Sequence, residues 1–238
     1  MKVLALDTAT ENCSVALFIN GRWLEREQLL GRGAAEVILP MVEALFAEAG
    51  LGLRDLDAVV FGRGPGGFTG VRLAASVTQG LAFGAGLGVV GVSDLQALAQ
   101  RAMREDPHCQ RVLACTDARM HEVYCGTFER DPTGVARAAA AERVAAPQRV
   151  SLPQAWAGAP RPFGVGSGFA AYPELTAALG GQLAQIRGNL WPRAREIAEL
   201  AMAEVAAGHL EPPERALPVY LRDDVTQPAR AAPPASSI

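Results

Sequence analysis

The stretch that decides the fold runs from Ala58 to Gln79 and reads AVVFGRGPGGFTGVRLAASVTQ. A short apolar run leads into a loop that holds five glycines and a proline, and a helix of small residues follows. Glycines in such a turn allow a phosphate or another backbone to come close, and the helix N-terminus attracts anions. The loop is therefore either an anion or nucleotide cradle or a tight turn that packs the helix closely on its sheet. A Walker loop is excluded because no Gly-Lys-Ser/Thr follows.

Composition places the chain among globular proteins. Its 238 residues, 50% hydrophobic and 20% charged, suffice for one large domain or two small lobes. A net charge of −3 argues against a broad basic surface for nucleic acid. The cysteines have no CxxC spacing, so neither a zinc site nor a redox pair is indicated; they are Cys13, Cys109, Cys115 and Cys125. The start of the chain does not resemble a signal peptide, and we expect a cytoplasmic protein.

One uncharged segment, residues 73–93, is long enough to cross a bilayer. It also holds Ser76, Thr78, Gln79 and five glycines. A buried helix, a turn and a buried strand explain this composition better than a membrane span. We therefore expect no membrane association.

The first half of the chain predicts three strands in meander order, then helices alternating with strands. The strands cover residues 2–6, 13–19 and 23–29, and Asn20-Gly21 is a strong hairpin signal between the last two. Helical periodicity covers 34–49, with Pro40 inside, and the helix after the glycine-rich loop covers 68–83. A strand at 89–92 follows. Ser93 with Gln96 forms a capping box that starts a helix reaching about residue 103.

The second half predicts another lobe. We place the boundary near residue 105, so that residues 1–104 form the first lobe and 105–225 the second. Strands are expected at 111–115, 122–128 and 163–165, helices at 172–179 and 193–207, and short irregular elements at 135–162. The helix at 193–207 is a candidate to pack back on the first lobe. Residues 226–238 are rich in Pro, Ala and Ser, which is typical of a disordered tail.

Seven short motifs, spread over most of the chain, together resemble the TsaB (YeaZ) family. The most specific is GPGGFTGVR at 64–72; the others are LALDTAT at 4–10, CSVAL at 13–17, ILPMV at 38–42, QGLA at 79–82, DARMHEVY at 117–124 and YLR at 220–222. Two positions depart from the family pattern. Gly67 replaces the usual serine of the loop, and residues 33–36 lack the histidine that many relatives carry before the first helix.

The resemblance implies an α/β fold of the ASKHA type, which is actin- and sugar-kinase-like and ribonuclease-H-like, with two lobes of mixed sheets flanked by helices. It implies a non-catalytic scaffold subunit for forming threonylcarbamoyladenosine beside the anticodon of tRNAs that read codons beginning with A. The implied partners are TsaD, the catalytic paralogue, and TsaE, with tRNA bound through the complex. Alone, members of the family form homodimers through the first two helices.

Catalytic groups are missing from the sequence. The resemblance implies that the active paralogue holds a metal with a His-x-x-x-His pair, whose imidazoles share one helix face. Here the histidines are far apart, at His108, His121 and His209. Neither a Ser-His-Asp nor a Cys-His grouping is found, so we expect no protease site, no metal and no catalytic residue.

An ATP-dependent phosphotransferase or ATPase of the ASKHA type is the alternative function. Its nucleotide would bind Asp7 and Thr8 together with Gly64, Gly66 and Gly67 of the glycine-rich loop. Ala9 stands where a glycine normally opens such a phosphate loop. We therefore expect no cofactor, beyond weak binding of a nucleotide at a vestigial site.

The two helices at 34–49 and 68–83 are the expected partner surface. They would pack against the matching pair of TsaD as a four-helix bundle, through Glu36, Pro40, Glu43, Phe46, Thr69, Arg72, Ala75, Ser76 and Gln79. A second charged group, Asp117-Ala118-Arg119, is either a partner-facing or interlobe salt link or a local hairpin turn. The sequence leaves both interpretations open.

Overall fold

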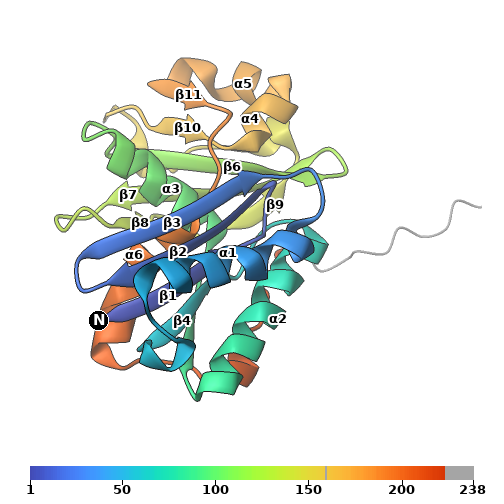
Figure 1. Cartoon of the computed structure of the whole chain (residues 1–238). Helices are drawn as coiled ribbons and strands as arrows, with labels where there is room; N and C mark the ends of the chain where they lie inside the picture. Colours follow the sequence, from blue (N-terminus) through green and yellow to red (C-terminus); the bar gives the residue numbers. More distant parts are fainter. Residues whose placement is uncertain (159, 223–238) are drawn as a thin grey trace, which may run out of the picture.

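Two mixed β-sheets, each with its own helices, form the two lobes of this computed structural model, which describes residues 1–158 and 160–222 (Figure 1). This is the α/β architecture that the sequence predicted. The predicted tail at 226–238 lies outside the described residues. None of the described helices is both long and apolar enough to cross a bilayer.

The first sheet has five strands in the order β3-β2-β1-β4-β5. Its antiparallel meander consists of β1 (Lys2–Asp7), β2 (Asn12–Ile19) and β3 (Arg22–Leu29). Asn20 has a φ of 46° and Gly21 a φ of 99°, as the predicted two-residue hairpin turn requires. On the other side of β1, β4 (Ala58–Gly62) and β5 (Gly88–Val92) run parallel to it.

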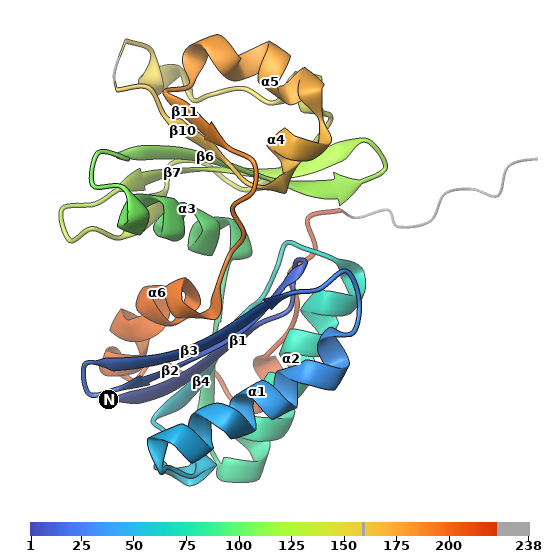
Figure 2. The ribbon, with the colours of Figure 1, turned by 45° about the horizontal axis from the view of Figure 1, so that its top comes forward.

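Helices cover both faces of the first sheet (Figure 2). On one face lie α1 (Ala34–Ala49) and α2 (Phe68–Ala85), whose inner side chains join Leu4 and Leu6 in a common core. The other face is covered by α6 (Ala194–Ala207), which packs on Val3 and Ala5. Because β1 is covered on both faces, its residues from Val3 to Leu6 are all apolar instead of alternating with polar ones.

The second sheet has the strand order β11-β10-β6-β7-β8, with β9 paired to β7. Its long hairpin is β6 (Arg111–Arg119) and β7 (Glu122–Arg130); the short strands are β8 (Ala136–Ala138), β9 (Arg143–Ala145), β10 (Phe163–Val165) and β11 (Gln185–Arg187). On one face pack α4 (Ser167–Ala171) and α5 (Pro173–Leu179). Short 3₁₀ helices complete the described chain: η1 (Leu53–Asp55), η2 (Pro147–Arg149), η3 (Gln154–Trp156), η4 (Gly180–Gln182) and η5 (Pro213–Arg215).

The other face of the second sheet is covered by α3 (Asp94–Glu105), capped at Ser93 as the sequence predicted, since the Gln96 N–H donates to Ser93 Oγ (3.2 Å). The lobe boundary differs from the prediction. Buried residues of α3, among them Leu98 and Met103, belong to the core formed with the second sheet. The chain therefore changes lobe before α3 and not at residue 105. Helix α6 later returns the chain to the first sheet.

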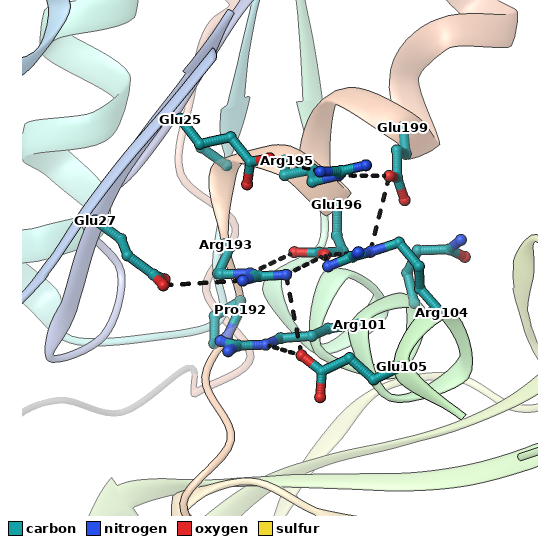
Figure 3. Close-up of polar contacts among 12 residues, drawn as sticks. Glu25, Glu27, Arg101, Arg104, Glu105, Pro192, Arg193, Arg195, Glu196 and Glu199 are labelled. Atoms are coloured by element: carbon teal, nitrogen blue, oxygen red, sulfur yellow. Dashed lines mark hydrogen bonds and ion pairs between the residues drawn. The ribbon is translucent and has the colours of Figure 1, made fainter. Parts of the chain in front are cut away.

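An arginine–glutamate network lies where α3 and α6 meet between the lobes (Figure 3). Glu196, fully buried, pairs with Arg104 of α3 at 2.7 Å and with Arg193 at 2.9 Å. Arg193 also reaches Glu105, which pairs with Arg187 of β11. Removing one partner of a buried pair leaves an uncompensated charge, so this network fixes α6 against α3.

Candidate functional site

The outer face of α1 and α2 carries large apolar side chains that remain exposed among the described residues. Leu39 is 44% exposed, Phe68 58% and Phe83 74%. Small residues lie on the same side of α2: Ser76 is exposed, and a Cβ on Gly80 or Gly84 would meet nothing within 4 Å. Glycines at these two positions are therefore not required by packing within the chain. An exposed apolar helix face of this kind is typical of a protein interface.

Most of the predicted partner-binding residues lie on or beside this face. Five of them are exposed: Glu36, Pro40, Glu43, Thr69 and Ser76. Three are half-buried: Phe46, Arg72 and Gln79. Ala75 is the exception, because it is only 4% exposed and belongs to the first lobe's own core. A helix built of small apolar residues on every side does not reveal from sequence which side faces the sheet. Gln79 is also engaged within the chain, where its Nε2 donates to the Ala216 carbonyl (3.1 Å).

The glycine-rich loop is packed against the turn that follows β1. The Gly67 N–H donates to the Ala9 carbonyl (2.7 Å), and Thr8 Oγ1 donates to the Gly70 carbonyl (2.7 Å). A Cβ on Gly66 or Gly70 would collide with the carbonyl oxygens of Ala9 and Thr8. The glycines thus permit close backbone packing, which is the tight-turn alternative of the sequence analysis.

Asp7, at the end of β1, is closed off from solvent. It is 0% exposed, and its Oδ1 accepts the Ala9 N–H (2.7 Å). Burial raises the pKa of this carboxyl to about 6. Gly64 and Thr8 are likewise buried, although Thr8 borders a cleft that Gly66 and Gly67 also line. The structure therefore does not bring the five predicted nucleotide-binding residues together at one open site.

The cleft, about 960 Å³ in volume, lies between the lobes. Segments 8–11, 30–36 and 65–73 line it from the first lobe, and 116–119 from the second. The segment 219–222 crosses between them. Arg72 lies over the rings of Phe68 and Tyr220, with its guanidinium carbon 3.2 Å and 5.0 Å from the ring centroids. Arg222 pairs with Glu122, so these two cleft arginines are engaged within the chain.

The Asp117–Arg119 group combines both interpretations that the sequence left open. Asp117 organises the hairpin turn locally, since its Oδ1 accepts the Arg119 N–H and the Tyr172 hydroxyl, both at 2.7 Å. Burial and this contact with Asp117 raise the pKa of Tyr172 to about 12, so the phenol stays a donor. Arg119 also reaches across the cleft to Glu11 (3.3 Å). Arg119, Met120 and His121 have positive φ values of 54–62°.

No group of three or more potential metal ligands occurs among the described residues. The histidines are exposed and lie in separate places, at His108, His121 and His209. All the cysteines are buried, and burial raises the pKa of Cys13 to about 11 and that of Cys109 to about 12. Their thiols therefore stay protonated at neutral pH and are inert.

The fold and the interlobe cleft define a two-lobed α/β protein of the ASKHA type. A sequence model described as "TsaD: tRNA N6-adenosine threonylcarbamoyltransferase" matches residues 28–229. The tRNA threonylcarbamoyladenosine biosynthesis protein TsaB of Escherichia coli (strain K12) is 40% identical over 231 residues, which are 94% of this chain and 96% of that protein. The chain belongs to the TsaB (YeaZ) family, and the resemblance seen in the sequence is confirmed.

Two solved structures from Pseudomonas aeruginosa have the same fold. One, described as an uncharacterized protein with similarity to the peptidase YeaZ, is 45% identical with a TM-score of 0.85, over 93% of this chain and 99% of that chain. The other, YeaZ, is 43% identical with a TM-score of 0.82, over 92% and 99%.

Proposed function

We propose that this chain is a non-catalytic subunit in the formation of threonylcarbamoyladenosine in tRNA, and that it binds TsaD through the outer face of α1 and α2. The names of its relatives support the pathway. The match to a sequence model of the transferase itself supports a paralogous pair, one member of which supplies the chemistry. We extend the proposal to recruitment of TsaE by the complex, and to a cytoplasmic location with tRNA bound through the complex.

The exposed face of α2 is the observation that carries the proposed contact. Ser76, Gly80 and Gly84 are four residues apart, so they lie along one side of the helix. Small residues in such a row let the backbone of another helix approach closely. Phe83 beside this row and Leu39 on α1 supply apolar area that a partner would remove from water. A matching pair of helices from TsaD would complete a four-helix bundle.

The same face serves a second copy of this chain when TsaD is absent. Both partners would compete for one surface, because the small-residue row admits only one close helix pair. We therefore propose a homodimer in isolation that exchanges for the heterodimer with TsaD.

We further propose that the chain works without a bound nucleotide or metal. Support comes from the loop, where the Gly67 N–H is already occupied by Ala9, and from the complete burial of Asp7. Calorimetry of the full chain with ATP and Mg²⁺ tests this point. Tight binding, together with ATP turnover that is lost in Asp7→Ala, would favour the phosphotransferase instead.

Substitution of Gly80 by Arg tests the partner surface. The position has open space, and arginine favours helix more than glycine does, so the fold is expected to persist. The bulky cation would prevent close helix approach. We expect loss of co-purification with TsaD and at least a tenfold fall in modified nucleoside in a reconstituted reaction with TsaD and TsaE, the affinity change that roughly 1.4 kcal/mol produces.

The matched control is Ala203→Arg, an exposed position on α6, which lies on the opposite side of the first sheet. It should leave both measurements unchanged. Undiminished co-purification and activity in Gly80→Arg would show that the proposed surface is wrong.

A further inference from the structure

Two carboxyl groups face each other inside the protein. Asp7 ends β1 and Asp94 is the first residue of α3, and both are 0% exposed. Gly62 lies beside them: a Cβ there would be 2.8 Å from Asp7 Oδ1 and closer still to Asp94 Oδ1. The Oδ1 atoms of both carboxyl groups therefore lie close to the same point beside Gly62. Only glycine at position 62 leaves room for this pair.

The hydrogen bonds around the pair leave one oxygen of each carboxyl group without a donor. Asp7 Oδ1 accepts the Ala9 N–H, and Asp94 Oδ2 accepts the Gly64 N–H. Asp7 Oδ2 and Asp94 Oδ1 have no partner among the residues that the structure describes. A buried carboxylate oxygen without a donor is costly, whereas one proton between two such oxygens satisfies both.

Charges near the pair do not compensate two carboxylates. Glu142 adds a further negative group, although its carboxyl accepts the Ser93 hydroxyl and faces the Arg63 guanidinium. The Cys13 thiol on β2 faces Asp7 and stays neutral. Burial, reinforced by Asp7, raises the pKa of Asp94 well above its usual range. Like-charged carboxylates in contact in a dry site cannot both ionise.

We propose that Asp94 is held as a neutral carboxylic acid that donates its proton to Asp7, and that this shared proton joins the end of β1 to the start of α3 beside the glycine-rich loop. We call the group formed by Asp7, Asp94 and Gly64 the proton latch. Asp94 makes two hydrogen bonds with Gly64. Its own N–H donates to the Gly64 carbonyl (3.1 Å), and its Oδ2 accepts the Gly64 N–H.

The proton latch connects the two lobes. Gly64 belongs to the loop that starts α2, whereas α3 packs in the core of the second sheet. Loss of the proton would place two negative charges together in a buried site and so weaken the junction between the end of β1 and the start of α3. The folded-state pKa is raised, so the stabilisation is complete below the ordinary aspartate value and is lost as the pH rises through the raised pKa.

The direct experiment is ¹³C NMR of the full chain labelled at the aspartate carboxyl carbons, titrated from about pH 5 to about pH 9. At neutral pH we expect one aspartate carboxyl still at its protonated chemical shift, and we expect that signal to move to the ionised position at higher pH. A spectrum in which every aspartate is ionised at neutral pH overturns the proposal, without need of any variant.

Asp94→Asn assigns the signal and tests the latch. An asparagine amide donates to Asp7 and its carbonyl still accepts the Gly64 N–H, but the side chain does not titrate. We expect the protonated resonance to disappear and the unfolding temperature to become independent of pH where that of the wild type falls. Asp55→Asn is the control, because Asp55 is exposed and makes local bonds to Gly52. A protonated resonance that persists in Asp94→Asn would also overturn the proposal.

Discussion

The two faces of the first sheet are covered by helices in different ways. Helix α6 is covered on two sides, since its apolar side packs on β1 and a charged side meets α3 through Glu196, and a further side is exposed at Ala203 and Glu204. Helices α1 and α2 pack on the sheet with one side only, and their outer side exposes Leu39 and Phe83. The same packing of a helix on a sheet can therefore end in a closed internal junction, as at α6, or in an exposed apolar surface, as at α1 and α2.

The largest expected effect comes from the covered side. Glu196→Ala should reduce the free energy of unfolding by about 3 kcal/mol, because Arg104 and Arg193 keep their charges without the buried partner. Glu204→Ala, at an exposed position on the same helix, should change it by less than about 0.5 kcal/mol. Urea unfolding of both variants provides the measurement. If both variants lost the same free energy of unfolding, the buried network would contribute no more stability than an exposed glutamate on the same helix.

An intermediate effect is expected on the inner side of α2. Gly70→Ala places a Cβ against the Thr8 carbonyl oxygen, and the backbone there cannot move without breaking the loop packing. We expect a loss of about 2 kcal/mol of stability. Thermal unfolding of the variant checks this value. An unchanged unfolding temperature would show that the loop is not tightly packed there, which would favour the anion-cradle interpretation.

The smallest effect is expected on the outer side of the same helix. At dilutions where the chain is monomeric, Gly80→Ala should stabilise it by about 1 kcal/mol, because alanine favours helix and nothing within the chain lies within 4 Å of its Cβ. In the same variant, affinity for TsaD should fall, since the added methyl group separates the helices. Thermal unfolding measures the expected gain in stability, and titration calorimetry on the same preparation measures the expected loss of affinity for TsaD. A destabilised Gly80→Ala would show that the outer side has an internal packing role.

Local sequence signals predicted most of the elements. The Asn20-Gly21 turn and the Ser93 cap depend on neighbouring residues only, and both are confirmed. Tertiary contacts decided the rest. Whether α3 belongs to the first or second lobe depends on Leu98 and Met103 meeting distant strands, and no local periodicity encodes that choice.

The candidate site was predictable in part for the same reason. Residues such as Ser76 were placed on an exposed face, but Ala75 was misjudged because its neighbours are apolar on all sides. The pairing of Asp7 with Asp94 was missed, since it joins the ends of two elements far apart in sequence. The sequence hinted at this pair only through the position of Asp94, which directly follows the capping Ser93 after an apolar strand.

The late position of α6 in the sequence affects how the protein folds during synthesis. The first sheet is complete at Val92, yet the helix that covers its second face begins at Ala194. During synthesis on the ribosome, the N-terminal lobe therefore emerges with the apolar side chains of Val3, Ala5 and Val60 bare, and it acquires its cover only after the whole second lobe has left the exit tunnel. The first sheet therefore reaches its final packing only after α6 has been made.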